Sequence, residues 1–220
     1  MKNMAKSFLS AEEQDRIVKA VKKAETLTSG EIVPMVVSCS YHYPMSNMIG
    51  ALAGSLVLAL VATSLFTRLR SWGGPELFDL WVFPAVFAVA FLLLFLVVKH
   101  IPVLKRVFIT KAEIAEEVEE AALTSFYRRG LGNTRDKTGI LIFISVFERQ
   151  VHVLADQGIN DRVEKGVWQE IVDMIAKGIK SRRQAEAICT AVLRCGELLQ
   201  EHFPIKQDDT DELENLIVED

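Results

Sequence analysis

Two long segments without a charged side chain constrain this chain more than any other feature of its sequence. Residues 48–66 read MIGALAGSLVLALVATSLF, and residues 80–98 read LWVFPAVFAVAFLLLFLVV. At about 1.5 Å per helical residue, each segment would span roughly 28 Å, close to the thickness of a bilayer's hydrocarbon core. A buried helix of a soluble protein usually keeps a polar stripe, and neither segment has one. We therefore predict a transmembrane hairpin over residues 45–100, with spans at about 48–66 and 80–98.

Basic residues beside the two spans predict which side of the membrane carries the rest of the chain. Those that follow the second span are Lys99, Lys105, Arg106 and Lys111. The loop between the spans contains only Arg68 and Arg70. Because Lys and Arg accumulate in short cytoplasmic flanks, we expect a two-span protein of the inner (plasma) membrane with both termini in the cytoplasm. The three cysteines also fit a reducing compartment.

The segment from Gly139 to Gly158 predicts a β-hairpin. Residues 140–147 are a nearly unbroken apolar run, typical of a strand that is buried on both faces. Apolar and other side chains then alternate over residues 151–155, the period of a second strand. We place the turn at Glu148-Arg149. Residues 31–40 predict a further strand, and Pro34 predicts an edge or bulge position in it because proline lacks a ladder donor.

The order of elements outside the spans predicts one domain in two pieces. Neither piece has a self-sufficient core, because the strand at residues 31–40 needs the hairpin as its partner. The predicted fold class is α/β, a small mixed sheet with helices on its faces. Residues 1–44 form its first part and residues 101–204 its second. Residues 205–220 form an acidic tail that we expect to be mobile, although it contains apolar residues that could dock: Leu213, Leu216 and Ile217.

The connection between the two pieces predicts how the sheet is oriented. A right-handed crossover makes the first hairpin strand parallel to the strand at residues 31–40. The turn at Glu148-Arg149 would then point toward the lipid, nearer to Met48 and Val98 than Asp156 is, with Arg149 near the headgroups. The opposite edge of the sheet would face the cytoplasm.

A set of carboxylates at that opposite edge predicts a cation site. Asp136 precedes the first hairpin strand, and Asp156 and Asp161 follow the second. Carboxylates beside loop carbonyls can hold a hard cation such as Ca²⁺ or Mg²⁺. The alternative is that Asp161 caps a helix, Asp156 caps a turn, and Asp136 pairs with a neighbouring basic residue. The sequence has no nucleophile elbow, P-loop or dinucleotide fingerprint, and its net charge of −4 argues against nucleic-acid binding.

Three motifs in the chain resemble the TPM-domain family, in particular its branch with a membrane hairpin inside the domain. They are TSGEIVPMVV (28–37), TRDKTGILIFIS (134–145) and ERQVHVLADQGI (148–159), followed by a helical pair that contains VWQEIV. The resemblance implies an α/β sandwich, with the metal site of the family carried over to Asp136 and Asp156. Secreted members have Gly-x-Gly and a downstream aspartate where this chain has Asp156-Gln-Gly158.

The resemblance also leaves three functions open. Some members of the family are described as acid phosphatases, some bind calcium, and others act in membrane-complex assembly or repair or as receptor auxiliaries. The leading hypothesis for this chain is assembly or maintenance of a membrane complex. The alternatives are a metal-dependent phosphatase that acts on phosphomonoesters and a divalent-cation sensor.

Overall fold

The computed structural model describes residues 3–69, 77–135, 137–164, 166–205 and 213–220, and these fall into two compact units. Unit 1 comprises residues 1–41 and 114–220, and unit 2 comprises residues 42–113. The helices are α1 (Met4–Phe8), α2 (Ala11–Glu25), α3 (Pro44–Leu69), α4 (Leu77–His100), α5 (Pro102–Val107), α6 (Lys111–Arg128), α7 (Gln157–Asn160), α8 (Val167–Lys180) and α9 (Gln184–His202), with a 3₁₀ turn at Leu131–Asn133. The strands are β1 (Glu31–Val37), β2 (Gly139–Ser145), β3 (Gln150–Ala155) and β4 (Ile217–Glu219). The α/β fold and its small mixed sheet are thus as predicted.

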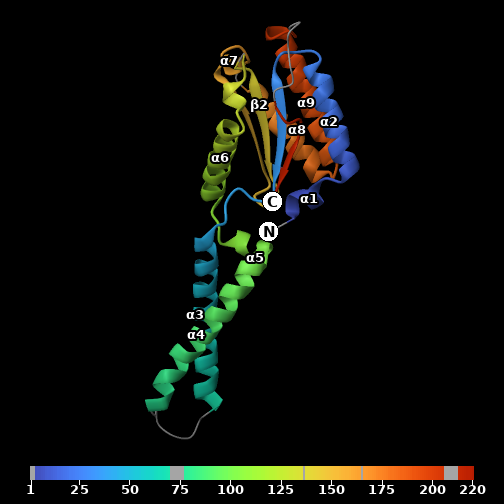
Figure 1. Ribbon diagram of the computed structural model, residues 1–220. Coiled ribbons are helices and arrows are strands. Elements are labelled where there is room, and N and C mark those ends of the chain that lie inside the picture. The colour runs from blue at the N-terminus through green and yellow to red at the C-terminus, as the bar shows by residue number, and fades with distance from the viewer. Residues whose placement is uncertain (1–2, 70–76, 136, 165, 206–212) are drawn as a thin grey trace. The chain divides into compact units, whose positions relative to one another are not determined.

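Unit 1 is built on one four-stranded sheet with the order β3-β2-β1-β4 (Figure 1). β1 is parallel to β2, and the register aligns Glu31 with Gly139. β2 and β3 form the expected antiparallel hairpin, in which Ser145 pairs with Gln150. The predicted parallel pairing and the hairpin turn are therefore confirmed. All residues of β1 and of β2 are buried, as the continuous apolar run of β2 predicted.

Helices α2, α8 and α9 cover one face of the sheet (Figure 1). The apolar side chains of β1 and β2 on this face are Ile32, Val36, Ile140, Ile142 and Ile144. α2 begins with the capping box formed by Ser10 and Glu13, which satisfies backbone donors at its first turn. Cys195 of α9 lies fully buried in this core, and the burial raises the pKa of its thiol to about 12.

The other face of the sheet is covered by α6, which lies on the opposite side from α2, α8 and α9 in Figure 1. The buried residues of α6 recur at helical spacing: Ile114, Val118, Ala122 and Phe126. On the sheet, Leu141 and Phe143 are fully enclosed. The sheet is thus a middle layer between two helical layers, and this explains why β1 and β2 carry no polar face.

The outer edge of β1 is closed by three different devices. Glu31 N–H donates to the carbonyl of Thr138 on the β2 side. Because backbone groups of successive strand residues point to opposite sides, those of Ile32 and Pro34 point to the outer side of β1. There, Ile32 N–H donates to Glu25 Oε1 at 3.2 Å, and Pro34 has no N–H to offer. Beyond Pro34, β4 pairs with Met35–Val37. The edge position predicted for Pro34 is right for the part of β1 that β4 does not reach.

The C-terminal tail corrects one expectation. The prediction of a mobile tail is wrong for Ile217–Glu219, which form β4 and lie parallel to β1. Ile217 is 5% exposed, and Leu216 packs against the core cluster. Docking through these apolar residues was the alternative that the sequence left open.

Unit 2 is a helical hairpin. α3 and α4 pack along each other, and small residues of α3 allow the close approach. A β-carbon added at Gly54 would lie 2.8 Å from Leu94 Cδ1, and one at Gly50 would lie 2.9 Å from the ring of Phe108. α5 follows as a short helix, in which Lys105 Nζ donates to the carbonyl of His42. Both apolar segments of the sequence are therefore helical and packed together.

Gly139, the first residue of β2, lies so close to neighbouring backbone that a larger side chain does not fit there. A β-carbon at Gly139 would lie 2.4 Å from the carbonyl oxygen of Leu131, whereas at Gly132 its nearest contact would be a ring carbon at 3.4 Å. We expect Gly139→Ala to destabilise unit 1 by roughly 1–3 kcal/mol because backbone must move, and Gly132→Ala to change stability little. The measurement is alkylation of Cys195 against urea, resolved by mass spectrometry from Cys39 and Cys189. Equal midpoints for the two variants would contradict the close approach.

Candidate functional site

The sheet edge predicted to carry the aspartates is formed by the start of β2 and the end of β3. Ile140 pairs with Ala155, so the two strands meet the edge together. Directly beyond them, Asp156 N–H donates to Gly139 O at 2.9 Å. This places Asp156 at the expected edge. Asp136, the first residue of the predicted set, lies outside the residues that the structure describes.

Asp156 is the N-cap of α7. Its Oδ1 accepts from Gln157 N–H at 2.6 Å, which satisfies a donor at the first turn. Its second oxygen, Oδ2, is enclosed, and no donor among the described residues bonds to it. An enclosed carboxylate oxygen without a partner is unusual because desolvation of charge is costly. Asp156 therefore combines the capping role of one hypothesis with an open ligand position that suits the other.

Asp161 lies at the other end of the same short helix. It is the C-cap of α7 and is exposed, so the structure brings Asp156 and Asp161 to opposite ends of α7 rather than to one point. α7 itself is held by Asn160, whose Nδ2 donates to Ala155 O at 2.8 Å and whose Oδ1 accepts from Trp168 Nε1 at 2.9 Å. The helix is thus fixed to both β3 and α8.

The loop before β2 lies close to α7. A β-carbon at Gly158 would lie 3.1 Å from the carbonyl oxygen of Lys137, and Thr134 Oγ1 accepts from Thr138 N–H at 3.1 Å inside this loop. A carbonyl and an open carboxylate oxygen are the ligand types that Ca²⁺ and Mg²⁺ prefer. Within the described residues, however, no group of three His, Cys, Asp or Glu side chains forms a ready ligand set. The described part of the edge therefore fits a cation only in part.

The opposite edge of the sheet contains a residue whose role the sequence did not reveal. Glu148 stands in the hairpin turn and is fully buried. Its Oε1 accepts from Ser40 N–H at 3.1 Å, and its Oε2 accepts from Ser145 Oγ. A glutamate beside an arginine in a predicted turn is usually solvated, so only the tertiary structure shows that Glu148 ties the turn to the end of the first chain segment of unit 1.

This contact bears on the predicted orientation. β1 and β2 are parallel, and Glu148 contacts Ser40, which lies just before the last residue of that segment, Tyr41. The hairpin turn is therefore at the edge where the chain leaves unit 1, and Asp156 is at the opposite edge. The comparison of Glu148-Arg149 and Asp156 with Met48 and Val98 stays a prediction, because the two units are described separately.

The comparisons with known proteins concern the family and the fold. A family model described as "TPM domain" matches residues 105–198. No curated protein matches the chain significantly. Among solved structures, the chain is similar to the NMR structure of the BA42 protein from the psychrophilic bacterium Bizionia argentinensis, with 21% sequence identity, a TM-score of 0.57, and coverage of 97% of this chain and 96% of that one.

At 21% identity, the structural likeness shows the fold alone. The family match covers the hairpin, α7, α8 and most of α9. Residues 105–198 of the chain are thus similar to the TPM domain.

Proposed function

We propose that this chain is an integral membrane protein that crosses the inner membrane through α3 and α4 and presents its TPM domain to the cytoplasm, where it serves in the assembly or maintenance of a membrane complex. The observation that carries the proposal is the surface of α4. Of its most apolar stretch only 6% is buried within the unit. Trp81, Leu92, Leu93 and Leu96 are all exposed, a surface that suits lipid and not water.

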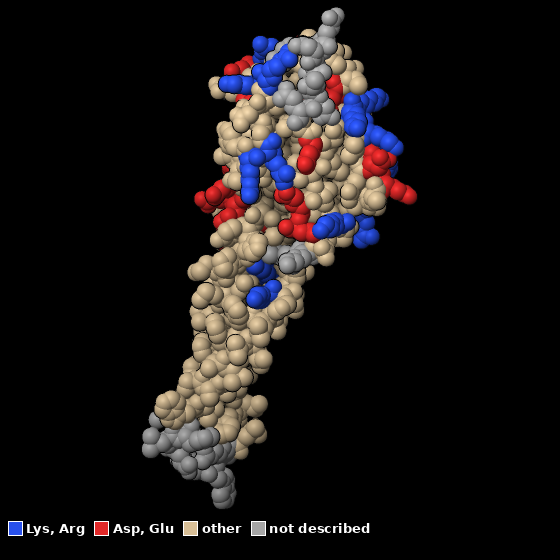
Figure 2. Space-filling view, viewed as in Figure 1, with Lys and Arg blue, Asp and Glu red and all other residues tan. Residues whose placement is uncertain are grey.

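The dimensions of the hairpin support the same proposal. α3 has 26 residues and the apolar part of α4, Trp81–His100, has 20. At about 1.5 Å per residue, these correspond to roughly 39 and 30 Å, enough to cross a hydrocarbon core of about 30 Å. Figure 2 shows charged side chains gathered on the visible face of unit 1, while unit 2 is free of them over most of its length.

The role in a membrane complex rests on family resemblance together with this anchor. A domain held at the membrane by two helices meets other membrane proteins at high local concentration. Unit 1 also uses both faces of its sheet for its own helices, so a partner would meet its helices, loops and sheet edges.

Membrane extraction tests the anchor and the complex together. We expect the tagged chain to stay in the membrane pellet at alkaline pH, and to migrate above the mass of a single chain after extraction in mild detergent and native electrophoresis. Leu93→Arg, which places a charge on the exposed face of α4, should weaken retention, whereas Leu123→Arg on the exposed face of α6 should not. Release of the unmodified chain by alkaline washing would refute the anchor, and migration as a single chain would refute the complex.

A fusion experiment tests sidedness. If the basic residues that follow α4 set the topology, a reporter fused after Asp220 is active only as a cytoplasmic reporter. Moving positive charge into the loop between α3 and α4, with Lys99, Lys105, Arg106 and Lys111 changed to Gln, should reverse the signal. Periplasmic activity of the fusion to the unmodified chain would contradict the proposed orientation.

The second candidate function is divalent-cation binding at Asp156, either for sensing or for phosphomonoester hydrolysis. The specific observation in its favour is the enclosed Oδ2 of Asp156, to which no donor among the described residues bonds; the loop carbonyl of Lys137 lies near Gly158 of the same short helix. Asp136 would complete the set from the same loop. A bound Ca²⁺ or Mg²⁺ would supply positive charge for a phosphate oxygen, while Asp156 would hold the ion at the N-terminus of α7.

Calorimetry on the detergent-solubilised full chain separates these functions. We expect binding of Ca²⁺ or Mg²⁺ at or below the millimolar range, weakened at least about tenfold by Asp156→Asn, since asparagine keeps the helix cap but loses the charge. Asp173→Asn, an exposed change in α8, is the matched control. Absence of binding at millimolar ion excludes both cation functions, and phosphomonoester hydrolysis that both Asp136→Asn and Asp156→Asn abolish would favour the phosphatase.

A further inference from the structure

The short strand β4 has two chemically distinct sides. Ile217 and Glu219 line hollows on the α6 side of the sheet. Leu216 and Val218 pack against the core on the other side, where Asp220 also bonds. This is the alternation of a strand, with successive side chains on opposite faces. The two consecutive acids at the end of the strand are therefore bound by different parts of unit 1.

On the α6 side, two neighbouring hollows of about 390 and 290 Å³ flank β4. Both are lined by Arg128 and Arg129, and the remaining lining is partly apolar, including Val33 and Met35 of β1. Arg129 Nη2 bonds Glu219 Oε1 here. An arginine beside an apolar strand edge suits a peptide whose apolar residue is followed, two positions later, by a carboxylate.

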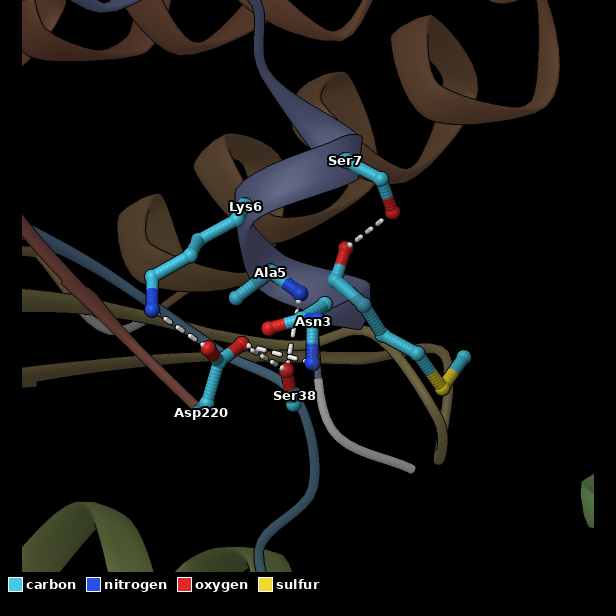
Figure 3. Close-up of polar contacts among 7 residues, drawn as sticks. Asn3, Ala5, Lys6, Ser7, Ser38 and Asp220 are labelled. Carbon is cyan, nitrogen blue, oxygen red and sulfur yellow. Dashed lines mark hydrogen bonds and ion pairs between the residues drawn. The ribbon is translucent and has the colours of Figure 1, made fainter.

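On the other side, α1 with its N-cap and Ser38, the residue that follows β1, bind Asp220 (Figure 3). Lys6 Nζ lies 2.7 Å from Asp220 Oδ2, while Ser38 Oγ and Asn3 N–H donate to Oδ1 at 2.9 and 3.0 Å. The hydrogen bonds from Lys6 and Ser38 hold the pKa of Asp220 below its ordinary value. Ser38, the residue that follows β1, also donates its backbone N–H to the backbone carbonyl of Glu219 at 2.9 Å, so this one residue contacts both consecutive acidic residues.

These contacts define a recognition site that lies outside the tail itself. The outer edge of β1 from Met35 to Val37, continued by Ser38, offers the backbone ladder, Arg129 binds one carboxylate, and Lys6 binds the next. The occupant is a strand of only three residues, so the ladder that retains it is short. Short elements with few ladder bonds open more readily than the core of a domain.

We infer that this edge of β1 is a binding groove for an extended segment of a partner protein in which apolar residues are followed by two acids, and that the chain's own residues 213–220 occupy the groove in its absence. A partner would add a parallel strand beside β1, a common mode of peptide recognition. The inference concerns unit 1 alone and holds whether or not the proposed function is right.

The test uses a labelled peptide with the sequence LENLIVED, amidated at its end, and the full chain in detergent. In the variant Glu219→Lys/Asp220→Lys, the tail meets Arg129 and Lys6 with like charge and leaves the groove, whose own residues are unchanged. We expect this variant to bind the peptide, and the unmodified chain to bind it at least about tenfold more weakly because its tail competes. Alkylation of Cys195 reports that unit 1 stays folded.

The controls address the two charge contacts. Adding Arg129→Gln to the tail variant should weaken peptide binding on the order of tenfold or more, since it removes a charge-assisted hydrogen bond to the glutamate of the peptide without offering the tail a new ion pair. The neutral peptide LENLIVQN should bind poorly. If the double variant loses protection of Cys195, Asp220→Asn alone serves as the milder release and should raise peptide binding above that of the unmodified chain.

Three results would overturn the inference. The first is a folded tail variant that does not bind the peptide. The second is equal binding of LENLIVED and LENLIVQN, which would mean that the groove does not recognise the two carboxylates. The third is an unmodified chain that is dimeric through exchanged tails, which would assign the groove to a second copy instead of a partner protein.

Discussion

The pairing of β1 with β2 is the contact on which unit 1 depends. It joins residues 31–37 to residues 139–145, and both strands are buried along their whole length. A parallel pair that is buried on both faces needs a helical layer on each side and a crossover between its strands. In this chain, unit 2 and α6 lie within that crossover. The sheet sets no upper limit on the length of this crossover, because the entropic cost of a connection grows only slowly with its length. Two apolar helices can therefore be inserted without dividing the domain.

The parallel pairing also gives different chemistry to the two edges of the sheet at which its strands begin and end. One edge carries the end of β1, the hairpin turn and the end of β4, with Ser38, Glu148 and Asp220 in bonded networks. The other edge carries the start of β2 and the end of β3, with Asp156 and α7. Carboxylates at the first edge are satisfied by serine and lysine donors, whereas Asp156 keeps one enclosed oxygen without a partner among the described residues. The first edge is thus suited to holding chain segments together.

The sequence predicted the elements whose signal is long and regular. The apolar run of β2, the alternation of β3 and the two uncharged segments each extend over several residues, and all are helices or strands as expected. Asp156 was correctly placed at the sheet edge, because antiparallel strands dictate which ends meet. β4 was not predicted as a strand, since three residues in an acidic tail carry little periodicity. Glu148 was placed in the turn, but its burial depends on Ser40, which lies more than a hundred residues earlier and on which local sequence is silent.

The two halves of the outer edge of β1 are covered in different ways, one by fixed parts of the domain and the other by a separate segment. Glu25 and Pro34 close the first half of this edge from within α2 and β1 themselves, so no unbinding event exposes it. The second half, from Met35 to Val37, is closed among the described residues by β4, which other parts of unit 1 hold through Arg129, Lys6 and backbone bonds. An uncovered strand edge invites pairing with another chain, so natural proteins protect or cover such edges. The segment that covers this half, β4, is separate from β1 and is bound through its own acidic residues. Replacing β4 by another segment would therefore change what the edge of β1 binds and leave the pairing of β1 with β2 intact.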